Sequence, residues 1–199
     1  IPLIHGADGQ KLSKSHGAVG LEAYRDEGFL PEALCNYLLR LGWSHGDDEI
    51  ISRDQAIAWF DLDHVGRSPA RFDRDKLTSI NAHYLRAGDD ARLVGMVLDR
   101  LAGRLGDRLS PDAKKRITAG LASLKERAKT VAELVDNAAF YAADGPVAVG
   151  EAAALLLTDN ARRALAALKP LLRDLAPWQA PAIEAALRAA CAEHDWKLR

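Results

Sequence analysis

The chain has 199 residues and a formal net charge of −1, with 48% hydrophobic and 28% charged residues. This is the composition of an ordinary soluble protein, and it excludes a low-complexity chain. We expect neither a membrane span nor a signal peptide, because no apolar stretch has the required length or flanks. Alanine and leucine dominate over β-branched and aromatic residues, which predicts a mainly α protein of one or two domains.

The cysteines and histidines form no pattern typical of a metal site or a disulfide. Cys35 and Cys191 both fall in apolar helical stretches, and no Cys-x-x-Cys or Cys/His cluster occurs. We therefore expect reduced cysteines, no bound metal on these residues and a cytoplasmic location. The scattered histidines are expected at the surface or as helix caps.

The first four residues, Ile1 to Ile4, form a short apolar run that predicts a β-strand. A buried strand needs partners, and the rest of the chain does not obviously supply one. The chain also lacks an initiator methionine. We interpret the sequence as a fragment of a longer protein.

A glycine-flanked loop from Gly6 to Gly17 contains two lysines, Lys11 and Lys14, separated by Leu12 and Ser13. Glycines allow such a loop to move, and lysine is a compact point charge suited to phosphate. Two ammonium groups on a closing loop could stabilise the charge that builds on a polyphosphate leaving group. The spacing is not that of a P-loop. A surface loop with two solvated lysines is the alternative.

Helix signals follow one another along the next seventy residues. We predict a short helix from Leu21 to Asp26 and a second that begins at Pro31. The apolar face of this second helix is expected to contain Leu34, Cys35, Leu38 and Leu41. A capping box at Ser52 and Gln55 opens a third helix, and Asp73 caps a fourth that runs to about Arg86. The segment from Asp61 to Ala70 is predicted to be irregular or extended.

The remainder of the chain predicts only helices. A long apolar face begins near Leu93, and Ser110-Pro111 opens another helix. Thr130 and Glu133 are spaced as a second capping box. Pro170 and Pro177 are expected to kink or end helices, and Trp178 to continue the apolar pattern.

Basic residues gather in two regions of the nearly neutral chain. Arg67 to Arg86 contains five basic and two acidic residues, and Arg104 to Lys129 contains eight basic and three acidic residues. Such patches permit local contact with nucleic acid without promiscuous binding. Helices with solvated charged faces are the alternative.

The run Lys11-Leu12-Ser13-Lys14-Ser15 resembles the Lys-Met-Ser-Lys-Ser signature loop of class I aminoacyl-tRNA synthetases. Its surroundings are similar to those of bacterial glutamyl-tRNA synthetases. The similar stretches are Ile4–Gly9, His16–Ala18, Pro31–Leu34, Asn36–Leu38, Leu41–Ser44 and Ser68–Asp73, with Lys76, Leu77 and Asn81. The likeness is strong to about Arg86 and weaker beyond. Ser15 departs from the arginine that is usual in glutamyl enzymes.

This resemblance implies a mainly α chain with three parts. Residues 1–17 would be the end of the catalytic domain, with a short strand and the signature loop. Residues 18–88 would be the stem-contact fold. Residues 89–199 would be an all-helical anticodon-binding bundle that is incomplete at its C-terminus.

The resemblance also implies roles for individual residues. Lys11 and Lys14 would be catalytic, and the whole loop from Lys11 through Leu12, Ser13 and Lys14 to Ser15 would bind ATP, with Lys14 the main contact. Candidate RNA contacts are Arg67, Arg71 and Lys76 in the stem-contact fold and Lys114, Lys115 and Arg116 in the bundle. A solvated surface remains the alternative for the last three. Phe72, Leu77 and Tyr84 are expected to be packing residues.

The full-length parent would be a glutamate–tRNA ligase that uses ATP with Mg²⁺, both bound mainly by an N-terminal domain. This chain has no His-x-Gly-His motif and no glutamate pocket, so alone it is expected to be inactive. Expected partners are tRNA-Glu, ATP and, through the N-terminal domain, glutamate, with tRNA-Gln left open. We expect a monomer and no membrane. Rival hypotheses are a free-standing RNA-binding helical module without catalysis and a helical scaffold that binds only protein.

Overall fold

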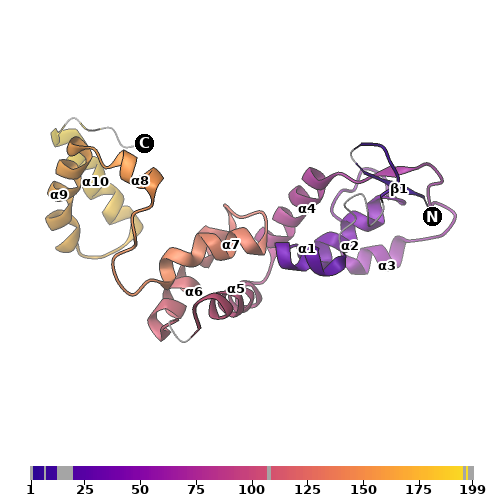
Figure 1. Cartoon of the computed structure of the whole chain (residues 1–199), viewed down its shortest axis with the longest axis horizontal. Helices are drawn as coiled ribbons and strands as arrows, with labels where there is room; N and C mark the ends of the chain where they lie inside the picture. Colours follow the sequence, from indigo (N-terminus) through magenta and orange to yellow (C-terminus); the bar gives the residue numbers. More distant parts are fainter. Residues whose placement is uncertain (1, 7, 13–19, 107–108, 195, 197–199) are drawn as a thin grey trace. The chain divides into compact units, whose positions relative to one another are not determined.

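The computed structural model describes residues 2–6, 8–12, 20–106, 109–194 and 196. The chain divides into two compact units, Ile1–Pro146 and Val147–Arg199, which are described separately (Figure 1). Helices dominate both units, as the composition predicts. The mainly α fold class is therefore confirmed.

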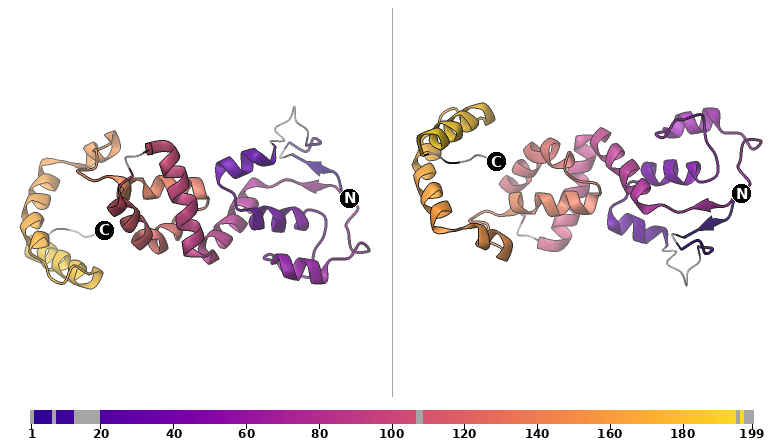
Figure 2. Two further views of the ribbon diagram at one scale, coloured as in Figure 1. Left: turned by 90° about the horizontal axis from the view of Figure 1, so that it is seen from below. Right: turned by 90° about the horizontal axis from the view of Figure 1, so that it is seen from above.

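The first unit begins with two short parallel strands, β1 (Ile4–His5) and β2 (Ala70–Arg71), which lie side by side in Figure 2. Ile4 pairs with Ala70 and His5 with Arg71. The predicted strand is thus shorter than expected, and Ile1 lies outside the described residues. The partner strand β2 begins at Ala70, the last residue of the segment predicted to be irregular or extended. The chain therefore does supply a partner for β1, which the sequence did not make obvious.

Four helices complete the first half of this unit. They are α1 (Leu21–Glu27), α2 (Pro31–Arg40), α3 (Arg53–Trp59) and α4 (Arg74–Ala87). The local start signals are confirmed: Pro31 opens α2, the Ser52–Gln55 capping box is complete, and Asp73 accepts from the Lys76 backbone N–H at 3.0 Å. Ser52 and Asp73 each place a side-chain oxygen where the first turn of a helix would otherwise leave backbone N–H groups unpaired. Pro31 has no N–H group that could be left unpaired.

The buried face of α2 differs from the predicted one. Cys35 is exposed and Leu38 is 46% exposed, whereas Ala33 and Tyr37 are buried with Leu34. The small Ala33 lets α2 approach its neighbours, and the Tyr37 ring packs edge-on against Phe72 with centroids 5.3 Å apart. Leucine spacing alone did not show which side of the helix these neighbours would occupy.

The second half of the first unit is a helical cluster. It contains α5 (Asp90–Leu105), α6 (Pro111–Lys125), α7 (Val131–Ala138) and the 3₁₀ turn η3 (Ala139–Ala142). Their inward side chains join α2 and α4 in one continuous core, as the predicted apolar periodicity requires. The most deeply buried of these side chains include Leu93, Val97, Leu101, Ile117, Leu121, Leu134 and Val135.

The predicted capping box of α7 is only half formed. The Thr130 hydroxyl accepts from the Glu133 N–H at 3.2 Å. The Glu133 carboxylate, however, accepts from the N–H of Lys129 at 2.7 Å and not from that of Thr130. The cap therefore also holds the connection that precedes α7.

Asn81, which is fully buried on α4, links the two halves of the first unit. Its Oδ1 accepts from the Leu30 N–H at 2.7 Å, and its Nδ2 donates to the Lys129 carbonyl at 2.6 Å. Beside it, the Val131 N–H donates to the Gly28 carbonyl at 2.9 Å. Gly28 has φ +89°, and a Cβ there would meet the Ala132 nitrogen at 2.4 Å, so only glycine fits this crossing.

The second unit contains α8 (Glu151–Leu156), α9 (Asp159–Arg173) and α10 (Ala180–His194). Pro170 lies within the last turn of α9, so it does not end the helix at its own position, whereas Pro177 lies between α9 and α10. Trp178 is 64% exposed, contrary to its predicted place in an apolar face. Among the described residues, no helix combines the length and apolarity needed to cross a bilayer.

The Asn81 link predicts a large stability effect. Asn81→Ala leaves a buried backbone N–H and a carbonyl without partners, which should cost roughly 2–4 kcal/mol of unfolding free energy. Urea unfolding followed by circular dichroism measures it. Asn137→Ala, on the exposed face of α7, is the matched control and should change stability by less than about 0.5 kcal/mol. Equal midpoints for the two variants would contradict the structural role of Asn81.

Candidate nucleic-acid interface

The start of the lysine loop folds back along β1. The Leu12 N–H donates to the Ile4 carbonyl at 2.8 Å, and Lys11 forms an antiparallel bridge with His5. Gly9, at φ +78°, allows the reversal between them. Lys11 is exposed at the base of the loop. Ser13, Lys14 and Ser15 lie outside the described residues, so their predicted roles stay predictions.

A cleft of about 220 Å³ lies beside the two strands and contains two of the predicted RNA contacts. Arg71 from β2 and Lys76 from α4 line it together with Arg40 from the last turn of α2. Its lining also includes the Tyr37 phenol, whose oxygen accepts from the Asp73 N–H at 2.6 Å. Sequence reasoning missed Arg40, because a single arginine at a helix end carries no signal of what lies beside it.

The cations of this cleft differ in how far they are neutralised. Lys76 Nζ donates to Glu49 Oε1 at 2.9 Å, and this bond holds the pKa of the Glu49 carboxyl below its usual value. Arg40 donates to the Asp48 carbonyl, while its Nε is buried with no partner among the described atoms. For Arg71, which is exposed, the described residues supply no ion pair. Arg71 is therefore the cation most available to an anion.

Arg67 is exposed in the connection before β2 and is not among the residues that line this cleft. The structure therefore brings Arg71 and Lys76 together but leaves Arg67 apart from them.

The basic run on α6 divides into two kinds of residue. Arg116 donates to the Tyr141 carbonyl, to the Ala143 carbonyl and to Asp144 Oδ1, at 3.0, 3.0 and 2.7 Å. It thereby fastens α6 to the end of η3. Lys115 pairs only with Asp112 on the same helix at 3.1 Å, and Lys114 is exposed. Lys114 and Lys115 face solvent, whereas Arg116 is engaged in holding the fold.

Two family models match the chain, one on each side of the end of α4. Residues 1–79 match "tRNA synthetases class I (E and Q), catalytic domain", and residues 92–199 match "Anticodon binding domain". These two matches identify the chain as part of a class I tRNA synthetase.

The relatives that match this chain are glutamate–tRNA ligases. The chain is 53% identical over its whole length to glutamate–tRNA ligase 2 of Paramagnetospirillum magneticum, covering 42% of that protein. It is 55% identical to glutamate–tRNA ligase 1 of Sphingopyxis alaskensis, over 95% of this chain and 39% of the relative. The crystal structure of a glutamate tRNA ligase from Elizabethkingia meningosepticum in complex with its amino acid matches with a TM-score of 0.76 and 26% identity, over 98% of this chain and 42% of that one.

The chain belongs to the glutamate–tRNA ligase family. It spans about two fifths of the length of the curated relatives it matches. The resemblance inferred from the signature loop is thereby confirmed.

The contacts of Arg116 predict a titration shift at Asp144. Hydrogen bonds from Arg116 and then from Ser110 hold the pKa of the Asp144 carboxyl below its usual value. Because the folded-state pKa lies below the unfolded one, the contact stabilises the fold at neutral pH, and this stabilisation is lost as pH falls through the folded-state pKa. Arg116→Gln should move the pKa of Asp144 back up towards its ordinary value.

Carboxyl-resolved NMR titration measures this pKa. Lys115→Gln removes a neighbouring cation that pairs with Asp112 instead, so it should leave the Asp144 titration unchanged. If Arg116→Gln also left it unchanged, the assigned contact would be wrong.

Proposed function

We propose that this chain is the tRNA-binding C-terminal portion of a glutamate–tRNA ligase, an enzyme that activates glutamate with ATP and transfers it to tRNA. The observation that carries the proposal is about 50% identity to such ligases across the whole chain, together with the anticodon-binding match. In this assignment residues 1–17 end the catalytic domain, 18–88 form the stem-contact fold and 89–199 form the anticodon-binding region. A free-standing RNA-binding module is less favoured, because the matches include a catalytic-domain segment.

The lysine loop is the part of this chain assigned to glutamate activation. The exposed ammonium of Lys11, at the base of a loop reversed by Gly9, suits a phosphate oxygen. ATP, when bound, supplies the pyrophosphate leaving group. Lys11 and Lys14 would hold positive charge against its oxygens, which stabilises the charge that develops there most strongly where water is excluded. Mg²⁺ and glutamate would be held mainly by the N-terminal part of the whole protein.

The RNA contacts are assigned to three exposed cations and to Lys76, which is half-buried and paired with Glu49. Arg71 and Lys76 line a common cleft, and Lys114 and Lys115 face solvent on α6. Ammonium and guanidinium groups on phosphates provide most of the affinity of a protein for RNA, whereas unstacked anticodon bases provide the specificity. The proposed partner is tRNA-Glu, with tRNA-Gln a further candidate. We also propose that the whole enzyme is a monomer and works in the cytoplasm.

This assignment predicts salt-dependent tRNA binding by the 199-residue chain itself. In filter binding with a transcript of a bacterial glutamate tRNA, the logarithm of the association constant should fall linearly as the logarithm of salt concentration rises, because phosphate contacts release counterions. A DNA hairpin of equal length is the comparison ligand and should bind more weakly. A flat salt response would contradict phosphate contacts and the proposal.

The loop assignment predicts a catalytic defect in the full-length enzyme. Lys14→Ala should slow ATP–pyrophosphate exchange, measured with tRNA present, by roughly 10²–10³-fold, the loss found when one preorganised electrostatic contact is removed. Lys169→Ala, on the exposed side of α9, removes a lysine in the second unit and should leave the exchange rate unchanged. Unaltered exchange in the Lys14 variant would refute the catalytic role.

A further inference from the structure

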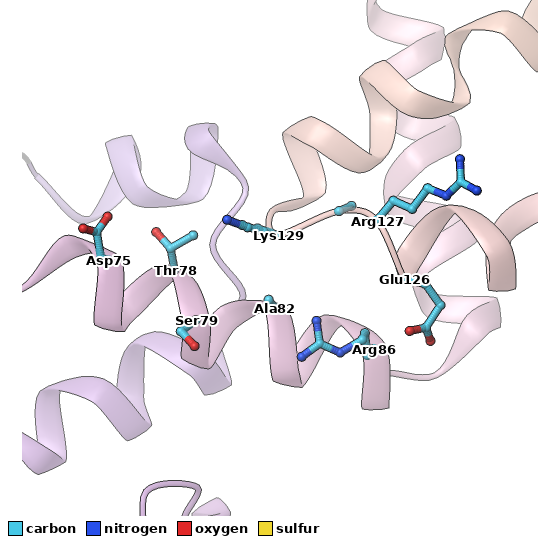
Figure 3. Close-up of a pocket in the computed structure, with 9 residues that line it drawn as sticks. Asp75, Thr78, Ser79, Ala82, Arg86, Glu126, Arg127 and Lys129 are labelled. Carbon is cyan, nitrogen blue, oxygen red and sulfur yellow. The ribbon is translucent and has the colours of Figure 1, made fainter. Parts of the chain in front are cut away.

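A second cleft, of about 360 Å³, separates α4 from the connection between α6 and α7 (Figure 3). One wall is a single face of α4, and the other is the chain from Glu126 to Lys129. The residues lining it are Asp75, Thr78, Ser79, Ala82, Arg86, Glu126, Arg127, Ala128 and Lys129. Arg86 and Lys129 lie at the ends of the two basic regions found in the sequence, but neither was named there as an RNA contact. The cleft falls where the catalytic-domain match gives way to the anticodon-binding match.

The walls of this cleft, called the joint cleft below, are held at a fixed separation. Asn81 on α4 donates to the Lys129 carbonyl at 2.6 Å, and Lys125 donates to the Gly88 carbonyl at 3.2 Å and to Asp90 at 2.5 Å. Ala82 and Ala128 are 5% and 1% exposed between these tethers. The joint cleft is therefore a preorganised feature, and a ligand there would not have to order its walls.

The cations of the joint cleft differ in their pairing from several cations on the adjacent helices. Arg92, Arg104, Arg116 and Lys125 all form ion pairs with carboxylates. Within the described part of the chain, Arg86 and Lys129 form none. Figure 3 shows Lys129 extending from the connection towards Thr78, while Arg86 extends from the last turns of α4. Two cations without an ion pair thus lie on opposite walls of a cleft that Asp75 and Glu126 also line. Figure 3 shows the Arg127 side chain turned away from α4.

The other residues that line the joint cleft limit the chemical class of the ligand. Asp75 and Glu126 would disfavour a ligand made only of phosphate, but a carboxylate accepts readily from a hydroxyl. The exposed Ser79 can donate or accept. A sugar–phosphate with a free 2′-hydroxyl satisfies both the cations and these acceptors, and the 2′-hydroxyl distinguishes RNA from DNA. The volume is at the lower end of small-ligand sites, which span about 300–1,000 Å³, so it suits one backbone nucleotide and not a helix end.

We propose that the joint cleft binds a ribose-phosphate of the RNA backbone through Arg86 and Lys129, as a contact additional to those assigned above. This inference rests on the proposed function, because it takes the RNA to be the tRNA. The cleft lies between the segments assigned to the stem-contact fold and to the anticodon-binding region. The bound nucleotide would accordingly belong to the stretch of tRNA between its acceptor end and its anticodon.

The test compares wild type with Arg86→Gln/Lys129→Gln in filter binding to the same glutamate tRNA transcript over a salt series. Each lost phosphate contact should lower the slope of log affinity against log salt by roughly 1, so the double variant should lose between about 1 and 2. Arg25→Gln/Arg53→Gln removes the same charge from exposed sites on α1 and α3 and should keep the wild-type slope. Circular dichroism confirms folding, and Lys129→Gln alone serves if the double variant unfolds.

Phosphate ethylation interference locates the contact. In wild type, ethylation at a small number of phosphates between the acceptor end and the anticodon should block binding, and this interference should vanish in the double variant. A salt-dependent wild type whose slope and interference pattern are unchanged by the double variant would overturn the joint-cleft proposal alone. A wild type that binds tRNA without salt dependence would overturn the proposed function and, with it, this inference.

Discussion

The buried amide of Asn81 is the interaction that fixes the first unit. Its donor and acceptor satisfy the Lys129 carbonyl and the Leu30 N–H at the same time, so α4 is held to two segments that are far apart in the sequence. A buried polar group is costly without a partner, and any shift of α4 would therefore leave several groups unpaired. The adjacent crossing at Gly28, too tight for a Cβ, reinforces the same joint. These hydrogen bonds and the close crossing at Gly28 set the spacing between the walls of the joint cleft.

For RNA binding, the pairing of individual charged residues matters more than the net charge of the chain. The net charge of −1 suggests little affinity for RNA, and exposed ion pairs such as Arg104–Asp136 add little stability. Their effect is on the surface potential, because each pair cancels a cation that would otherwise attract phosphate. Three of the described cations that form no ion pair, Arg71, Arg86 and Lys129, border clefts. Local recognition of a polyanion is thereby compatible with a nearly neutral protein.

Local features were predictable from the sequence, and features that depend on distant contacts were not. The starts of α2, α3 and α4 follow from Pro31, Ser52 and Asp73, because a cap acts within one turn. The buried side of α2, the β2 partner of β1 and the place of Arg40 in a cleft all depend on segments that meet only in the folded chain. The family was recognisable from the loop because its residues are contiguous, whereas the cations of the joint cleft come from α4 and a remote connection.

The strand pair connects the proposed catalytic element to the proposed RNA-binding surface. Lys11 bridges to His5 in β1, the His5 carbonyl accepts from the Phe72 N–H at 2.8 Å, and Asp73 then caps α4. Helix α4 in turn forms one wall of the joint cleft. All of these contacts lie within one compact unit. The base of the loop and the cleft therefore keep a fixed separation. An RNA backbone held on α4 would therefore be positioned relative to the loop by the fold itself, without a conformational signal between them.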